Sequence, residues 1–147
     1  MRDIADVFGR LKREVNGEWY VMSDEYIKGW DLDLKLGKMG EDFTRDVLEG
    51  NTKVEVKTER DIWKTTGNIA IEIRYKNIPS GISTTQSGVW VHLLSYKGKI
   101  EGGYIFKVNE LRDFIKKLKK EGRLNLTMGG DDNLSQLVLL PIKELFI

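Results

Sequence analysis

The sequence predicts an α/β fold in which a central mixed β-sheet is flanked by helices. Between residues 52 and 108, several short segments alternate apolar and polar side chains and are separated by glycine- or asparagine-containing turns, as strands are. Residues 109–121 instead repeat apolar side chains at helical spacing. The 147 residues contain no internal repeat, low-complexity tract or proline-rich linker. We therefore expect a single domain over residues 1–147.

The first third of the chain mixes helical and strand-like patterns. Apolar residues recur at helical spacing over 3–14, which predicts an amphipathic helix. Residues 31–36 alternate leucine with charged side chains, as in a half-buried strand. Two interpretations stay open for residues 43–49, which form either a strand or the end of a helix over 37–48.

The middle and the end of the chain are predicted in more detail. One sheet is expected to contain strands at 43–49, 52–59, 68–75, 89–94 and 103–108. The helix over 109–121 follows and ends at Gly122. The tail then holds a glycine-acid turn at 128–133, a buried strand and a short helical turn.

Composition limits the chemistry that the chain can perform. It has no cysteine and one histidine, His92, which excludes disulfides, thiolate metal sites and zinc sites built from several histidines. Carboxylate, lysine and hydroxyl chemistry remains, and we expect His92 to be structural. The sequence shows neither a secretion signal nor an apolar run long enough to span a membrane. We therefore expect an intracellular protein without a membrane partner.

A pair of carboxylates and a lysine are candidates for catalysis. If a hairpin closes at Gly50-Asn51, Asp46 lies directly opposite Glu55, with Cβ atoms about 4.5–5.5 Å apart. Lys57 projects from the same strand face as Glu55. Carboxylates this close repel each other unless a cation lies between them. Mg²⁺ suits this ligand type, and a metal-bound water beside a lysine is a reasonable nucleophile for a phosphodiester. The pattern predicts a Mg²⁺ site, with Mn²⁺ as a substitute.

Two other interpretations of these residues stay open. If residues 37–48 form one helix, Asp46 points about 140° away from the face that carries Glu41, because each residue advances a helix by about 100°. Asp33 or Glu72 would then replace Asp46 as a metal ligand. Alternatively, the strand around Glu55 is an ordinary one whose polar face is in water.

An ordered series of motifs runs through the chain. It consists of Gly40-Glu41, Asp46, Glu55-Val56-Lys57, the segment TGNIAIE at 66–72, the segment PSGISTT at 79–85 before a tryptophan-containing strand, and GGDDN at 129–133. In this series the sequence resembles the PD-(D/E)xK nuclease superfamily, in particular its small phage and viral members. The resemblance covers roughly residues 33–140, and the ordered series is far more specific than a Glu-x-Lys triplet.

The resemblance implies a fold, an activity and a site. The fold would be a restriction-endonuclease-like core, and Glu41, Asp46 and Glu55 would hold Mg²⁺ directly or through water. Lys57 would position or activate the water that attacks a DNA phosphodiester. The leading activity is that of a structure-directed endonuclease that cuts Holliday junctions or other branched DNA during recombination. It would act as a homodimer, in the host-cell cytoplasm if the protein is phage-encoded.

Two alternatives to this activity remain open. One is a sequence-specific endonuclease of the restriction type, and the other is a DNA-binding module that kept the fold without catalysis. In all three cases DNA is the partner. Two polar segments carry cations, hydroxyls and an aromatic ring suited to phosphates and bases. The residues expected to contact DNA are Arg60, Trp63, Lys64, Thr65, Thr66, Ser80, Thr84 and Thr85. The same segments also suit a solvated loop with Trp63 folded onto the core, and an ordinary Ser/Thr-rich turn.

Overall fold

The computed structural model describes residues 12–15, 18–21 and 24–146, and side chains from residue 34 onward. The chain forms two compact units, residues 1–48 and 49–147. The helix expected over 3–14 lies outside the described residues except at 12–14, which belong to a strand. Within the described ranges, no helix combines the length and the apolar character needed to cross a bilayer. The single domain stays a prediction.

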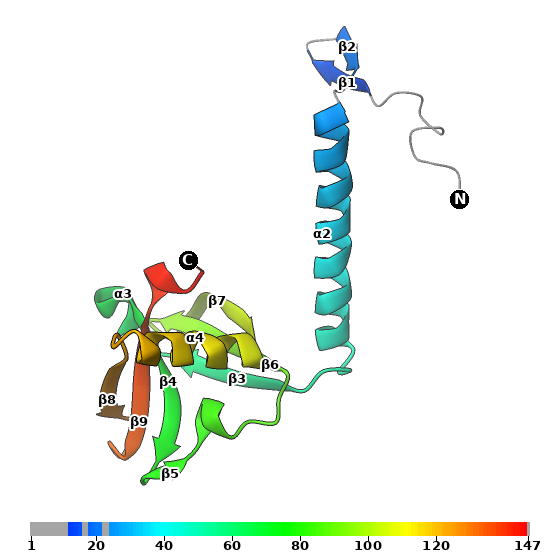
Figure 1. Ribbon diagram of the computed structural model, residues 1–147. Coiled ribbons are helices and arrows are strands. Elements are labelled where there is room, and N and C mark those ends of the chain that lie inside the picture. The colour runs from blue at the N-terminus through cyan, green and yellow to red at the C-terminus, as the bar shows by residue number, and fades with distance from the viewer. Residues whose placement is uncertain (1–11, 16–17, 22–23, 147) are drawn as a thin grey trace. The chain divides into compact units, whose positions relative to one another are not determined.

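The N-terminal unit contains a hairpin and a long helix (Figure 1). Strand β1 (Lys12–Val15) pairs antiparallel with β2 (Glu18–Val21), and helix α2 spans Asp24–Leu48. The strands expected at 31–36 and 43–49 are therefore wrong, whereas the alternative of a helix over 37–48 is confirmed.

The sequence of α2 explains why a helix forms there. Met39, Phe43 and Val47 recur at helical spacing, and no proline interrupts the 25 residues. Asp42 lies within ion-pairing distance of Lys38 one turn before it, at 3.8 Å, and of Arg45, at 3.1 Å. Such pairs each contribute a few tenths of a kcal/mol, roughly 0.2–0.5. The alternating leucines near the middle of α2 would fit a strand equally well. The helical period extends over more residues, and the segment is a helix.

The C-terminal unit contains a mixed three-stranded sheet. Its order is β3 (Val54–Glu59), β6 (Val89–Tyr96) and β7 (Lys99–Lys107). β3 and β6 are parallel, and β6 and β7 are antiparallel. The mixed sheet expected from the sequence is thus confirmed, as are the strands at 52–59, 89–94 and 103–108 within a few residues. A parallel pair needs a long crossover, and residues 60–88 provide it.

That crossover includes part of a second, antiparallel sheet. Its order is β5 (Ile78–Pro79), β4 (Asn68–Tyr75), β9 (Ser135–Pro141) and β8 (Asn125–Gly129). The expected strand at 68–75 and the buried C-terminal strand are confirmed. The strands of this unit therefore belong to two sheets, and the expectation of one sheet is wrong.

Helical segments complete the C-terminal unit. The helix expected over 109–121 is confirmed as α4 (Val108–Lys120). Short turns of helix occur as α3 (Trp63–Thr66), η1 (Gly81–Ser83) and η2 (Ile142–Glu144). α4 is strongly amphipathic, with Leu111 and Leu118 buried on one face and lysines on the other.

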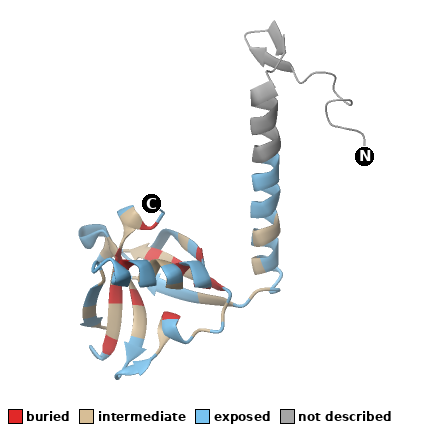
Figure 2. Ribbon diagram, in the orientation of Figure 1, coloured by how far each residue is buried: buried red, intermediate tan, exposed pale blue. Residues whose placement is uncertain are grey.

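One hydrophobic core joins both sheets and α4. Ile69 and Ile71 of β4 lie directly opposite Leu140 and Val138 of β9, and all four are fully buried. Trp90 of β6 is also fully buried in this cluster. Figure 2 shows these buried stretches on the facing strands of the C-terminal unit. Burying side chains of this size supplies the main favourable free energy of folding.

This core predicts the effect of removing one side chain from it. Ile71→Ala should lower the free energy of unfolding by about 2–5 kcal/mol, because it leaves a cavity between the sheets. Ile78→Ala is the matched control, since Ile78 is 68% exposed, and should change it by less than about 0.5 kcal/mol. Urea unfolding measures both, and equal losses in the two variants would contradict this placement of the core.

Candidate active site

Strand β3 carries a row of charged side chains on one of its faces. Glu55, Lys57 and Glu59 alternate along the strand and therefore share this face. Parallel pairing places Glu55 beside Trp90 and Lys57 beside His92 on β6. Trp90 and His92 are buried, whereas Glu55 and Glu59 are half-buried and Lys57 is exposed. The prediction that Glu55 and Lys57 share a face is confirmed.

Glu55 and Lys57 form an ion pair at the surface end of this face. The Lys57 Nζ lies 2.7 Å from the Glu55 Oε1, and the two side chains are 44% and 31% exposed. An ion pair this exposed contributes about 1 kcal/mol or less to stability. The Lys57 ammonium also lies 5.8 Å from the centre of the Trp90 ring. The pair therefore places an ammonium beside a carboxylate, in a position open to solvent.

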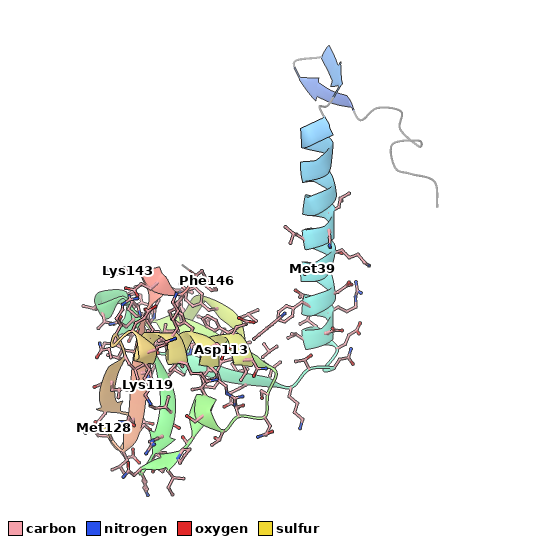
Figure 3. The ribbon with its side chains drawn as sticks, viewed as in Figure 1. Met39, Asp113, Lys119, Met128, Lys143 and Phe146 are labelled. Atoms are coloured by element: carbon pink, nitrogen blue, oxygen red, sulfur yellow. The ribbon has the colours of Figure 1, made fainter. Side chains whose placement is uncertain are left out.

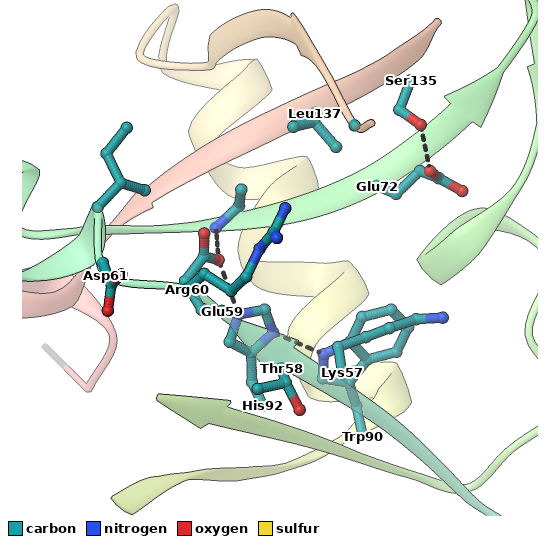
Figure 4. Close-up of a pocket in the computed structure, with 13 residues that line it drawn as sticks. Lys57, Thr58, Glu59, Arg60, Asp61, Glu72, Trp90, His92, Ser135 and Leu137 are labelled. Atoms are coloured by element: carbon teal, nitrogen blue, oxygen red, sulfur yellow. Dashed lines mark hydrogen bonds and ion pairs between the residues drawn. The ribbon is translucent and has the colours of Figure 1, made fainter. Parts of the chain in front are cut away.

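A cavity of about 600 Å³, lined by both polar and apolar side chains, lies beside this face (Figure 4). Lys57 and Glu59 of β3 line it from one side, and Glu72 of β4 lines it from the other. The cavity thus lies where strands of the two sheets approach each other. It is large enough for several water molecules or a phosphate group.

Glu72 is the carboxylate on the far side of this cavity. Its Oε2 accepts a hydrogen bond of 2.5 Å from the Ser135 Oγ, and its Oε1 accepts one from the Ser80 Oγ. Ser135 is buried and lies on β9. Glu72 was expected as an alternative ligand, whereas no sequence pattern pointed to Ser135, which lies 63 residues away along the chain.

Residues 80–85 form a loop whose hydroxyl groups contact both Glu72 and Glu55. Ser80 donates to Glu72, and the Thr85 Oγ1 donates to the Glu55 Oε2 at 3.4 Å. Both were predicted to contact DNA. In the structure their hydroxyls face carboxylates, while Thr84 between them is exposed. The loop therefore connects the two carboxylates across the gap between sheets.

A buried histidine completes the inner part of the cavity. The Trp90 indole N–H donates to the His92 Nδ1 at 3.3 Å, and the His92 Nε2 lies 3.0 Å from the Glu59 Oε2. Because an indole N–H is a donor only, Nδ1 accepts, and the imidazole proton lies on Nε2 and is donated to Glu59. Glu59 also accepts from the Ala70 backbone N–H at 2.8 Å. This network, drawn in Figure 4, supports the structural role expected for His92.

The remaining predicted ligands lie on α2, in the other unit. Glu41 and Asp46 are helical residues, and Asp33 belongs to the part of α2 whose side chains lie outside the described residues. The opposition of Asp46 to Glu55 in a hairpin is wrong, because residues 43–48 are helical and β3 pairs with β6. A contribution of Glu41, Asp46 or Asp33 to metal binding stays a prediction.

Oxygen donors in and near the cavity are of the type that binds hard divalent cations: Glu72 lines the cavity, and Glu55 pairs with the lining residue Lys57. Glu55, Glu72 and their hydroxyl partners offer oxygen ligands, which Mg²⁺ prefers. Among the described residues, no three carboxylate or imidazole groups gather closely enough to hold a metal ion on their own. Mg²⁺ commonly takes one or two carboxylates and keeps several waters. Glu55 and Glu72 therefore match Mg²⁺ by ligand type, and Mg²⁺ binding stays a prediction.

The other residues expected at DNA lie around α3 and are partly engaged within the protein. Trp63 donates its indole N–H to the Ser95 carbonyl at 2.7 Å, so its ring is held against the core. The Lys64 ammonium lies 2.6 Å from Glu101, and the Thr66 hydroxyl bonds to the Ile62 carbonyl. Thr65 is exposed. Arg60 is largely exposed and lines the cavity while pairing with Asp131 at 3.2 Å.

Hydrogen bonds to Asp132 tether the turn between β8 and β9 near the cavity. The Tyr75 hydroxyl donates to the Asp132 Oδ2 at 2.6 Å, and the Leu134 backbone N–H donates to Oδ1 at 3.0 Å. The hydrogen bond from Tyr75 lowers the pKa of Asp132, and the same bond raises the pKa of Tyr75. Gly130 of this turn lines the cavity, so the tether fixes part of its rim.

Comparison with known proteins identifies no relative. No protein-family model, no curated protein and no solved structure matches the chain. The resemblance to PD-(D/E)xK nucleases therefore rests on the motifs in the sequence and stays a prediction.

The Asp132 tether predicts a dependence of stability on pH. The carboxylate has a lower pKa in the folded chain than in the unfolded one, so its contribution is present above about pH 4 and is lost as pH falls through the folded pKa. Asp132→Asn should therefore destabilise the protein at pH 7 and have a smaller effect near pH 3. Asp113→Asn, which removes an exposed carboxylate from α4, is the control. Urea unfolding across this range would contradict the tether if the Asp132→Asn difference did not shrink in acid.

Proposed function

We propose that this chain is a Mg²⁺-dependent endodeoxyribonuclease whose hydrolytic site is centred on Glu55 and Lys57 of β3. The observation that carries the proposal is the 2.7 Å pair of Lys57 and Glu55 beside a cavity that Lys57 lines together with the carboxylate of Glu72. Carboxylates with a neighbouring ammonium suit hydrolysis of a phosphodiester, in which negative charge increases in the transition state.

Each residue of the site has a defined task in this proposal. Glu55 and Glu72 are the carboxylates of this unit that would hold Mg²⁺. When bound, Mg²⁺ supplies a positive charge that polarises the phosphate and lowers the pKa of a coordinated water. The Lys57 side chain is 44% exposed, and in this proposal its ammonium contacts a phosphate oxygen or the attacking water.

Other side chains would bring the DNA backbone to this site. Arg60 lines the cavity and is largely exposed, so its guanidinium can exchange Asp131 for a phosphate oxygen. Thr65 and Thr84 are exposed and can donate hydroxyl hydrogen bonds to phosphates. We propose Holliday junctions or other branched DNA as the substrate and a homodimer as the active form, because cutting two strands requires two sites.

A DNA-binding module without catalysis is the second candidate. The observation that favours it is that both carboxylate oxygens of Glu72 accept hydrogen bonds from hydroxyl groups. Such a module would bind DNA through Arg60 and its neighbours but would leave every DNA form uncut.

Replacing Lys57 separates these two functions. In Mg²⁺ or Mn²⁺, Lys57→Ala should cut a four-way junction about 100-fold more slowly than the wild type, because the charge beside the scissile phosphate is lost. Junction binding, measured in Ca²⁺, should change much less. Lys119→Ala removes the same charge from the exposed face of α4 (Figure 3) and should cut at the wild-type rate. Wild-type cutting by Lys57→Ala would refute the role of Lys57, and absence of cutting by the wild type would favour the DNA-binding module.

The choice of substrate is tested with the wild-type protein. Four-way junctions, Y-shaped DNA and linear duplexes of several sequences are compared under single-turnover conditions. We expect the branched forms to be cut preferentially and at positions that follow the branch point when the sequence is changed. Cutting of linear duplexes at one fixed sequence would instead identify a restriction-type enzyme, which reads base edges.

A further inference from the structure

Arg112 of α4 makes two hydrogen bonds to the loop that contacts the candidate site. Its Nε donates to the Ile82 carbonyl at 2.9 Å, and its terminal NH2 donates to the Thr85 carbonyl at 2.8 Å. The guanidinium is a rigid, planar fork of donors. Two carbonyls three residues apart are therefore fixed relative to each other and to α4.

The loop itself is compact and lies directly against β4. Ile82 at its centre is 2% exposed and belongs to the hydrophobic core. Gly81 has a φ of +55°, and a Cβ at this position would overlap the backbone carbonyl of Glu72. The Thr84 and Thr85 amides donate to the Gly81 carbonyl at 3.2 and 3.0 Å. Little space remains for the loop to shift without moving Glu72 or Glu55.

The two ends of this loop contact the two carboxylates of the site. Ser80 donates to Glu72 on β4, and Thr85 donates to Glu55 on β3. β3 and β4 belong to different sheets and share no backbone pairing. The loop therefore links the side chains of Glu55 and Glu72, and Arg112 of α4 holds the loop from outside.

We propose that Arg112 is a positioning residue for the hydrolytic site. It acts through the loop Ser80–Thr85, which orients Glu55 and Glu72, and it does not itself contact the DNA. This inference rests on the proposed function for its catalytic consequence. Its structural consequence, the order of the loop, is independent of any activity. A misplacement of catalytic groups by about 1 Å can cost about 100-fold in rate, so the effect should be large.

The experiment compares three variants of the full chain. Arg112→Met removes both hydrogen bonds, and Arg112→Lys retains the charge and can make one of them. Lys116→Met removes the same charge one turn further along α4, where the ammonium is exposed and pairs with Asp113. Amide hydrogen exchange of Thr84 and Thr85 is measured on the protein alone. Single-turnover cutting of a four-way junction and junction binding in Ca²⁺ are measured separately, and thermal unfolding confirms that each variant is folded.

If Arg112 positions the loop, the three variants should differ in amide exchange and cutting rate as follows. In Arg112→Met, exchange at Thr84 and Thr85 should become at least about 10-fold faster. The cutting rate should fall about 10- to 100-fold at nearly unchanged junction affinity. Arg112→Lys should lie between Arg112→Met and the wild type, and Lys116→Met should match the wild type in exchange and cutting rate.

Other results would overturn the inference or the proposed function. Unchanged exchange in both Arg112 variants removes the positioning role, whatever the cutting rate. Weaker junction binding at an unchanged cutting rate identifies Arg112 as a DNA contact instead. If the wild type cuts no DNA, the proposed function fails. Faster exchange in Arg112→Met then still supports the assignment of the loop to Arg112, because that measurement uses the protein alone. Arg112→Lys keeps the test valid if Arg112→Met does not fold.

Discussion

The link between Glu55 and Glu72 through one loop is the constraint on which the candidate site depends. The two carboxylates lie on strands of different sheets, so no backbone ladder sets their relative position. Hydroxyl groups of Ser80 and Thr85 connect them instead. The buried Ile82 between these hydroxyls ties the loop to the hydrophobic core. Stability of the fold and geometry of the site are therefore coupled at this loop.

A second polar connection between the two sheets runs through Glu59. β4 has β9 as its neighbour along Ala70, and the Ala70 backbone N–H on the other side is satisfied by the Glu59 carboxylate of β3. Glu59 in turn accepts a hydrogen bond from the Nε2–H of the buried His92. Burying polar groups costs free energy unless they are hydrogen-bonded. Among the described residues, every buried side-chain nitrogen and oxygen atom has a partner. A cavity that contains charged side chains can therefore persist next to the core.

Local patterns in the sequence predicted the elements with a clear period. The strands around Glu55 and Glu72 and the helix α4 follow from alternation and from helical spacing, and so does the shared face of Glu55 and Lys57. The interpretation of residues 43–49 as a strand failed, because the helical period that begins upstream outweighs the β-like composition of that short segment. The hydrogen-bond partners of the site residues could not be predicted from the sequence. Contacts such as Ser135 with Glu72 and Arg112 with Thr85 join residues 63 and 27 positions apart, and no local pattern encodes such pairs.

The central claim is that Glu55 and Glu72 hold a divalent cation beside Lys57. Anomalous diffraction from a crystal soaked in Mn²⁺ tests it most directly, because Mn²⁺ accepts the same oxygen ligands as Mg²⁺ and its position can be seen without any assumption about activity. The account predicts a Mn²⁺ peak in contact with the carboxylate oxygens of Glu55 and Glu72, lost in a Glu55→Gln crystal. A peak that touches neither residue, or well-ordered carboxylates without a peak at saturating Mn²⁺, would contradict it.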